Sequence, residues 1–365
     1  MNNHPQFHGS DIEAASAYYN IPKEDIVCFS SNVNPLGLSE SFKKTLADHL
    51  DVLSSYPDRN YSSLKSALAK YCNVSADYFL VGNGSTEMIS VLIHTRHPQK
   101  ALIIAPTYSE YERELSLIGC TLDEYVLQES NDFQLNFEDF SNYMKNGKYE
   151  LVILCNPNNP TSSALTVSQI RTMLEICKMN HSFLMIDETY VEFTDDINKY
   201  TAMSLLPEYD NFIVLRGVSK FYASPGMRFG YAATSNQELH QAFLKLQNPW
   251  SLNSLAAFAG EIMFFDTAYI EKTRTHILSE KNRMTKELST ISGLKVYPSH
   301  ANFVLVKLLI PNVTSYDIFD FLMKKGLMVR DCSSFECLDG EYFRFCIMDT
   351  EENNRLLDAI HAFIN

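Results

Sequence analysis

Short apolar runs alternate with helical stretches along the middle of this chain. Five of these runs are apolar at nearly every position: ALIIAP (101–106), LVILCNP (151–157), FLMIDE (183–188), FIVLRG (212–217) and FGYAAT (229–234). Strands that are apolar on both faces belong to a sheet that helices cover on both sides. The pattern therefore predicts an α/β unit with a mostly parallel central sheet.

Helical periodicity lies on either side of this region. We expect one helix to begin at Ser39, a residue type that suits the N-cap position. Another is expected over 61–72, where Leu64 and Leu68 lie on one apolar stripe. A long amphipathic stretch at 255–290 leads out of the strand-rich region.

The two ends of the chain differ from its middle. Residues 1–35 look irregular, whereas the last part of the chain mixes short strand-like runs with helices, which is an α+β pattern. We predict an arm over residues 1–38 that contributes to the small domain and the substrate site, a large ligand-binding domain over 39–255, and a small α+β domain over 256–365. No flexible linker separates the domains, so they are expected to share an extensive interface.

Charge and cysteine usage narrow the class of partner. Lys and Arg number 30 against 44 Asp and Glu, a formal net charge of −14, which argues against a general binder of nucleic acid or anionic membrane. No apolar stretch approaches the roughly 18 residues of a membrane span, and no signal peptide is visible. The eight cysteines include no CxxC pair, so we expect free thiols, no metal site and a cytoplasmic protein.

The segment VGNGSTEMIS (81–90) follows strand-like residues and opens a helix. Small residues at a helix N-terminus present free backbone N–H groups and the positive end of the helix dipole, which suits a phosphate. Ser85 and Thr86 add hydroxyl donors. The segment lacks the GxGxxG fingerprint that a nicotinamide oxidoreductase would need, and it is not a Walker loop. An N-capped helix turn without a ligand is the alternative interpretation.

Two further strand ends carry polar side chains. LCNPNNPTS (154–162) has two Asn-Pro pairs after a buried strand, and Asn159 could aim its amide into a site. MIDETY (185–190) ends the next strand with two carboxylates, and Asp187 would be costly to bury without a cationic partner such as a protonated heterocyclic nitrogen. The alternatives are a plain turn and a surface carboxylate, and the latter suits Glu188 better.

LRGVSKFYASPGMRFGY (215–231) contributes Lys220 and Arg228, two cations in a stretch that looks like a buried turn. A lysine in apolar surroundings has a lowered pKa and is nucleophilic, which prepares it for a Schiff base. Arg228 can fork onto a phosphate. Two cations that reach into solvent are the alternative. Because open α/β sheets bind ligands where strands end, these segments together meet the requirements of pyridoxal 5′-phosphate.

The order of these motifs resembles that of the fold-type I superfamily of pyridoxal-phosphate-dependent aminotransferases. A small-residue phosphate cup, PTY, NPNNPT, D-x-x-Y, and S-K with an arginine eight residues later follow one another over nearly the whole chain. The resemblance implies an α/β enzyme whose large domain has a mostly parallel sheet sandwiched by helices, with a small α+β C-terminal domain. It also implies a homodimer with shared active sites.

Two families within the superfamily are similar to this chain: the threonine-phosphate decarboxylases of cobalamin biosynthesis and the histidinol-phosphate aminotransferases of histidine biosynthesis. FHGSD (7–11), NVNPLGLS (32–39), SYPDRNY (55–61), SKFYASPGMRFGY (219–231) and NPWSLNSLAAFAGE (248–261) look more like the decarboxylases. The resemblance implies decarboxylation of phosphothreonine or phosphoserine. The alternative that it leaves open is transamination of histidinol phosphate with 2-oxoglutarate.

The resemblance also implies roles for matching positions. As catalytic groups, Lys220 would bond the cofactor aldehyde and move protons, and Asp187 would pair with the ring nitrogen. Tyr190, the third catalytic group, and Asn159 would hydrogen-bond the phenolic oxygen of the ring. The other cofactor contacts that it implies are Tyr108 on the ring face, Ser85, Thr86, Ser219 and Arg228 on the phosphate, and Tyr56 reaching the cofactor of a partner subunit.

The resemblance also implies four substrate contacts, and two positions differ from the pattern of the related families. Arg344 in YFRFCI would bind the substrate carboxylate. The substrate phosphate would be held by Arg330 in MVRDC together with His8 and Asn32, although His8 could equally be a free histidine of the arm. Gly217 stands where the superfamily often has Ser or Thr, and Met348 stands where decarboxylase-like proteins carry an arginine.

Overall fold

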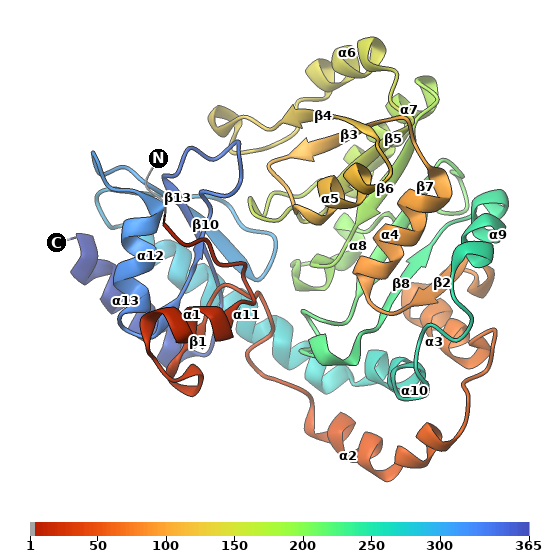
Figure 1. The fold of residues 1–365 in the computed structure, drawn as a ribbon, viewed down its shortest axis with the longest axis horizontal. Coiled ribbons are helices and arrows are strands. Elements are labelled where there is room, and N and C mark those ends of the chain that lie inside the picture. Colours follow the sequence, from red (N-terminus) through yellow and green to blue (C-terminus); the bar gives the residue numbers. More distant parts are fainter. Residues whose placement is uncertain (1–3, 365) are drawn as a thin grey trace.

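The computed structural model describes residues 4–364 and contains a seven-stranded sheet, a four-stranded sheet and a two-stranded pair (Figure 1). In spatial order, the strands of the large sheet are β2 (Phe79–Gly82), β8 (Gly230–Ala233), β7 (Phe212–Gly217), β6 (Phe183–Asp187), β5 (Leu151–Cys155), β3 (Lys100–Ala105) and β4 (Thr121–Val126). Only β8 runs antiparallel to its neighbours. Each of the five predicted apolar runs forms a strand, and the predicted fold class is confirmed.

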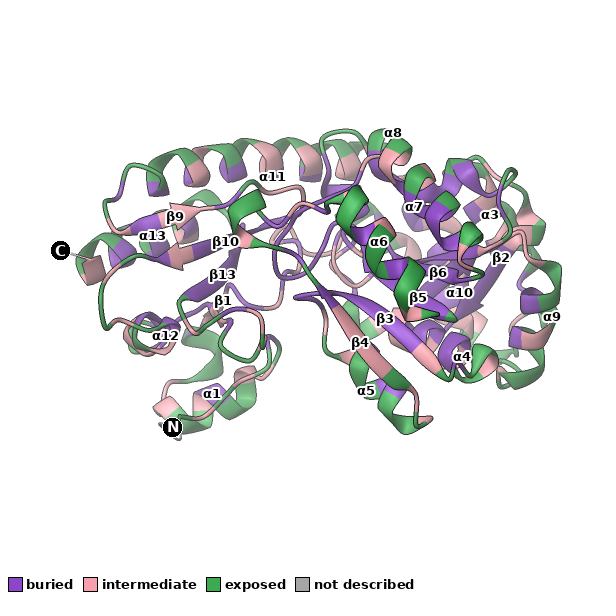
Figure 2. Ribbon diagram, turned by 90° about the horizontal axis from the view of Figure 1, so that it is seen from above, coloured by how far each residue is buried: buried purple, intermediate pink, exposed green. Residues whose placement is uncertain are grey.

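Side chains of the large sheet alternate between two hydrophobic clusters. On β6, Ile186 belongs to one cluster and Met185 to the other, and on β7 the same alternation separates Val214 from Leu215. Figure 2 shows α6 and α7 above the sheet and α4 and α5 below it. The helices around the sheet are α3 (Ser62–Cys72), α4 (Ser85–Arg96), α5 (Glu110–Leu117), α6 (Phe137–Gly147), α7 (Val167–Met179), α8 (Ile197–Tyr200), α9 (Gln237–Leu246) and α10 (Ser254–Ile262).

The smaller sheet is antiparallel and carries the C-terminal part of the chain. Its strands, in spatial order, are β12 (Arg330–Asp331), β13 (Tyr342–Cys346), β10 (Phe303–Leu308) and β9 (Leu294–Val296). A parallel pair, β1 (Val27–Cys28) with β11 (Leu327–Met328), joins the N-terminal segment to this unit. The accompanying helices are α1 (Ile12–Tyr19), α11 (Thr267–Leu288), α12 (Ser315–Met323) and α13 (Thr350–Ile364).

One local prediction from the sequence needs correction. The N-terminal arm is not irregular throughout, since it contains α1, whose only buried residue is Ala15 and whose apolar periodicity is therefore weak. The amphipathic stretch 255–290 forms α10 and α11, which the 3-10 turn η8 (Met263–Phe265) separates, and Asp266 caps α11 by accepting from the backbone N–H of Tyr269.

The predicted start of the helix after Ser39 is confirmed. The Ser39 hydroxyl accepts a hydrogen bond from the backbone N–H of Phe42 and caps α2 (Glu40–Asp48). The division at 38/39 and 255/256 stays a prediction, and its second boundary falls inside α10, which packs on α3. The remaining 3-10 helices are η1 (Lys23–Asp25), η2 (Leu50–Ser54), η3 (Ala76–Tyr78), η4 (Glu129–Asn131), η5 (Val191–Phe193), η6 (Ala202–Leu205) and η7 (Pro225–Met227).

Among residues 4–364, no helix combines the length and the apolar character that crossing a bilayer requires. The same residues contain no group of three or more His, Cys, Asp or Glu side chains arranged to hold a metal ion.

The close approach of β8 to the loop before α4 makes a stability prediction. A Cβ atom at Gly230 would lie 2.4 Å from the backbone of Gly84 and Ser85. We expect Gly230→Ala to lower the free energy of unfolding by about 1–3 kcal/mol or more, because rigid backbone must move. Gly226→Ala is the matched control, since no atom lies within 4 Å of its added methyl group. Urea denaturation compares them, and equal stability of the two variants would contradict the prediction.

Candidate active site

A cavity of about 620 Å³ lies at the carboxyl ends of the parallel strands, between the two sheets and the N-terminal arm. Its walls contain every predicted site residue except Tyr56. They are His8, Asn32, Ser85, Thr86, Tyr108, Asn159, Asp187, Tyr190, Ser219, Lys220, Arg228, Arg330 and Arg344. Segments that are far apart in the sequence therefore meet in one concave site, as expected for an open α/β sheet.

Lys220 lies just beyond the end of β7. Its Nζ donates a hydrogen bond of 2.5 Å to the backbone carbonyl of Ser31 in the N-terminal segment. Burial, and next the positive charge of Arg344, lower the pKa of Lys220 to about 8. The neutral, nucleophilic amine is thus accessible near neutral pH. The contact with Ser31 was not predicted, because nothing in the sequence near Ser31 marks it as a partner.

Asp187 is the last residue of β6 and is buried. Its Oδ2 accepts from the Tyr111 hydroxyl at 2.7 Å, and its Oδ1 accepts from the backbone N–H of Thr189 at 2.9 Å and from the Thr189 hydroxyl at 2.6 Å. Burial raises the pKa of Asp187, and these hydrogen bonds oppose the shift. All three donors are neutral, so the carboxylate can still accept a cationic partner in the cavity.

Tyr111 lines the cavity but was not predicted from the sequence motifs. It lies on α5, three positions after Tyr108, and the two rings meet edge to face at 5.6 Å. Tyr108 lies just before α5, and the backbone N–H of Tyr111 donates to its carbonyl at 3.4 Å in the turn that opens the helix. The second tyrosine of PTYSEY was the signal that could have identified Tyr111.

The segment that we predicted to be a phosphate cup lies at the start of α4. Gly84 is the N-cap with a φ of 91°, and a Cβ there would lie 2.5 Å from Nη2 of Arg228. The guanidinium thus lies against the glycine backbone. Its Nη1 donates to the carbonyl of Pro225 at 3.0 Å. Arg228 itself is exposed, which corrects the expectation of two buried cations in this stretch, because the Pro225–Met227 turn carries it outward.

Gly217 packs directly against the cup. A Cβ atom at this position would lie 3.4 Å from the hydroxyl oxygen of Ser85. Ser85 therefore already presents a hydroxyl beside the place from which a Ser or Thr at 217 would donate. At this distance an added Cβ would make an ordinary van der Waals contact with Ser85.

Arg344 on β13 is buried and joins three parts of the chain. Its Nη2 donates to the carbonyl of Ser30 at 2.7 Å, and its Nη1 donates to Oδ1 of Asn159. The Nε atom of Arg344 and the Oδ1 atom of Asn32 have no partner among the described residues, although both are buried. Asn32 uses its Nδ2 to donate to the hydroxyl of Tyr190 at 3.2 Å. Buried polar atoms without partners at a cavity wall indicate that a ligand completes the site.

Arg330 lies beside the N-terminal arm at the cavity wall. It donates to the carbonyl of Phe7 and, at 2.8 Å, to the hydroxyl of Ser334. Partial burial, followed by the charge of Arg330, lowers the pKa of His8. Both groups line the cavity. Phe7 and Ser334 were not predicted.

Tyr56 is the one predicted residue that lies outside the cavity. Its side chain is 82% exposed, and its ring lies 5.1 Å from that of Trp250. The structure of one chain therefore does not bring Tyr56 to the other predicted residues.

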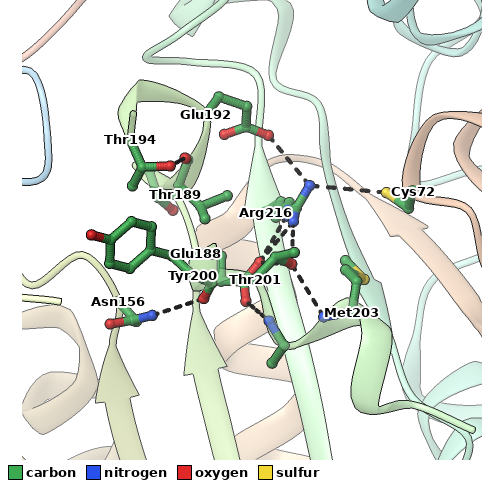
Figure 3. Close-up of polar contacts among 12 residues, drawn as sticks. Cys72, Asn156, Glu188, Thr189, Glu192, Thr194, Tyr200, Thr201, Met203 and Arg216 are labelled. Atoms are coloured by element: carbon green, nitrogen blue, oxygen red, sulfur yellow. Dashed lines mark hydrogen bonds and ion pairs between the residues drawn. The ribbon is translucent and has the colours of Figure 1, made fainter. Parts of the chain in front are cut away.

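Arg216 is a buried cation that the sequence did not predict. It is 2% exposed and pairs with Glu188, whose side chain is fully buried (Figure 3). The interpretation of Glu188 as a surface carboxylate is therefore wrong. The apolar run FIVLRG hid the cation, since its partners lie elsewhere in the chain.

Comparison with known proteins identifies the family. Residues 24–360 match the family of class I and II aminotransferases. The chain is 33% identical over 353 residues to the threonine-phosphate decarboxylase of Salmonella typhimurium (97% of this chain, 95% of that protein). It is 29% identical over 360 residues to the histidinol-phosphate aminotransferase of Methanococcus aeolicus (98% and 95%).

The solved structure of the histidinol-phosphate aminotransferase from Clostridium acetobutylicum has the same fold. It superposes with a TM-score of 0.86 at 32% identity, covering 92% of this chain and 98% of that one. The lysine with a lowered pKa, the carboxylate with neutral donors and the unpartnered atoms at the cavity wall fit the cofactor of such enzymes. The chain therefore belongs to the class I and II aminotransferase family, and it is an enzyme that uses pyridoxal 5′-phosphate.

Proposed function

We propose that this enzyme decarboxylates O-phosphothreonine or the closely related phosphoserine. The observation that carries the proposal is the pairing of Arg330 with Arg344, which lie directly opposite each other on β12 and β13. Residues opposite each other on antiparallel strands point to the same face, and like charges there are unfavourable. A substrate with both a carboxylate and a phosphate neutralises both guanidinium groups. Histidinol phosphate has a phosphate but no carboxylate, and its co-substrate 2-oxoglutarate has two carboxylates but no phosphate, so neither molecule alone neutralises both groups.

We assign different residues of the cavity to different parts of the cofactor. We assign the aldehyde to Lys220 and the ring nitrogen to Asp187, whose carboxylate would hold the proton of that nitrogen. Asn159 and Tyr190 would hydrogen-bond the phenolic oxygen, and Tyr108 would cover the ring face. The phosphate contacts that we assign are Ser85, Thr86, Ser219 and Arg228.

Bound pyridoxal 5′-phosphate supplies a sink for the electron pair of the bond that breaks at the substrate Cα. Orientation of the substrate by this chain decides which bond that is. Arg344 holds the carboxylate, and Arg330 with His8 and Asn32 holds the phosphate. After loss of CO₂, Lys220 would return a proton to Cα.

We infer that two copies of the chain share their active sites. Tyr56 lies beside the exposed Trp250. Leu50 and Leu53, which belong to η2 just before Tyr56 in the chain, are exposed as well. Large exposed apolar side chains that gather in this way favour a protein interface. Tyr56 from one copy would contact the cofactor phosphate of the other. All eight cysteines are free, which fits the reducing cytoplasm where we propose that the enzyme works.

Transamination of histidinol phosphate is the second candidate. Met348, where decarboxylase-like proteins carry an arginine, uses its backbone N–H and carbonyl to bond Asn353 and His276. Met348 is not among the residues that line the cavity. An anion-binding arginine is thus lacking at 348, which favours this candidate.

Two incubations separate the candidates. With pyridoxal 5′-phosphate bound, we expect CO₂ release from O-phosphothreonine, and slower release from phosphoserine, because one methyl group changes kcat/KM by roughly 10- to 200-fold. Histidinol phosphate with 2-oxoglutarate should yield no glutamate. Glutamate without any CO₂ release would overturn the proposal in favour of the aminotransferase.

The lowered pKa of Lys220 predicts how cofactor binding depends on pH. The amine is charged below a pKa of about 8 and neutral above it. We expect the rate at which cofactor-free protein acquires visible absorption with added pyridoxal 5′-phosphate to rise with pH around a midpoint near 8. Lys220→Ala should give no such absorption band. A midpoint near 10.5, the ordinary lysine value, would contradict the assignment of burial as the cause.

A further inference from the structure

A buried ion pair lies behind the cavity, and the proposed reaction does not use it. Arg216 of β7 donates from Nε at 3.0 Å and from Nη2 at 2.8 Å to the same oxygen, Oε2 of Glu188 (Figure 3). Taking two charges out of water costs several kcal/mol per ion. Such a pair persists only where other hydrogen bonds complete it.

The segment after β6 supplies those bonds. The Thr201 hydroxyl oxygen accepts from Arg216 Nη2 at 2.6 Å and lies 2.8 Å from Glu188 Oε2, to which it donates. The backbone N–H of Ala202 donates to the other carboxylate oxygen of Glu188 at 2.6 Å. Both oxygens of Glu188 are therefore satisfied without solvent.

The pair lies on the opposite face of the sheet from Asp187. Glu188 follows Asp187 directly, and Asp187 is paired in register with Leu215, which precedes Arg216. The backbone N–H of Glu188 also donates to the carbonyl of Leu215 at 2.8 Å. Because successive side chains alternate between faces, the ion pair joins the ends of β6 and β7 from behind, while Asp187 faces the cavity.

Segment 187–192 alternates between the two sites. Asp187, Thr189 and Tyr190 line the cavity, whereas Glu188 and Glu192 approach Arg216. Any shift of this segment against β7 would therefore move the cavity side chains as well. Lys220 follows Arg216 by four residues, so the ion pair also lies close along the chain to the lysine.

Glu192 is the third member of this cluster. Its Oε1 lies 3.6 Å from Nη1 of Arg216, and its Oε2 has no partner among the described residues. Burial raises the pKa of Glu192 to about 7. The charged and titratable groups that face it from the surrounding elements are Glu188, Arg216, Arg274, Tyr71, Cys72, Tyr222 and Tyr231. With Glu192 protonated, Arg216 and Glu188 form a neutral pair.

We propose that Arg216, held by Glu188, is a positioning residue for the cofactor site, which fixes the Asp187 carboxylate relative to Lys220 Nζ. The inference rests on the roles assigned above to these two groups. Apolar residues of similar volume often replace a buried ion pair without loss of stability, so stability alone does not account for the pair. Two hydrogen bonds from one planar guanidinium fix the orientation of Arg216 relative to Glu188, whereas apolar packing would not.

The test replaces the pair and is run at pH 6, where Glu192 keeps its proton, so that no buried charge is left alone. In Arg216→Met combined with Glu188→Gln, we expect the melting temperature of cofactor-free protein to stay within about 3 °C of the parent. The dissociation constant for pyridoxal 5′-phosphate should rise at least about 10-fold. The pH titration of the visible absorption of the bound cofactor should also shift, because Asp187 and Lys220 no longer hold their relative positions. A stable double variant with the parent affinity and titration would overturn the inference.

Two further variants keep the test decisive. Arg216→Lys retains the charge but cannot fork, so it should weaken cofactor binding by an intermediate factor even if the double variant fails to fold; parent-like binding by this variant would refute the positioning role. Arg171→Met removes an Arg–Glu pair on the surface and should leave cofactor binding unchanged. If the parent itself bound no pyridoxal 5′-phosphate, the proposed function would fail, which is a different outcome.

The raised pKa of Glu192 gives a separate prediction for stability. In the folded protein the carboxyl keeps its proton up to a pKa of about 7, against an ordinary value of 4.5. The folded state thus binds more protons between these values, so its stability falls as pH rises from about 4.5 through 7. Glu192→Gln removes this loss. We expect the melting temperature of the variant to exceed that of the parent by a larger margin at pH 8 than at pH 5, and an equal margin at both would contradict it.

Discussion

The parallel register of β6 with β7 is the constraint on which the rest of the site depends. It pairs Asp187 with Leu215, so both strands end at the same edge of the sheet. The loop after β7 then carries Lys220 over the edge where Asp187 ends β6. Parallel strands have this property in general, which is why ligands of open α/β sheets bind at the carboxyl ends.

The small sheet adds a second wall that the large sheet lacks. Its β12 and β13 present two arginines to the cavity, and the N-terminal segment accepts hydrogen bonds from both of them and from Lys220. Each of these three bonds ends on a backbone carbonyl of residues 7, 30 or 31. The arm therefore joins the cations of the two sheets through its main chain, whose geometry does not depend on side-chain type.

The buried charged groups on the two faces of the large sheet have different kinds of partner. On the cavity face, Asp187 has neutral donors and Lys220 has a lowered pKa, so both can respond to a ligand. On the opposite face, Arg216 and Glu188 are bonded to each other and to Thr201 and Ala202. The ends of β6 and β7 thus carry Asp187 and Lys220, which can respond to a ligand, on one face, and the ion pair of Glu188 with Arg216 on the other.

The sequence by itself determined the fold class and the local chemistry. Apolar runs, the small-residue cup before α4 and the lysine after FIVLRG depend on neighbours within a few residues, so their pattern is legible without a structure. Only the tertiary structure decided that Arg216 is buried and Arg228 exposed, and that Tyr111 and Ser31 contact Asp187 and Lys220. These outcomes depend on which distant segments meet, because burial and hydrogen bonding are set by the folded surroundings of a side chain and not by its neighbours in sequence.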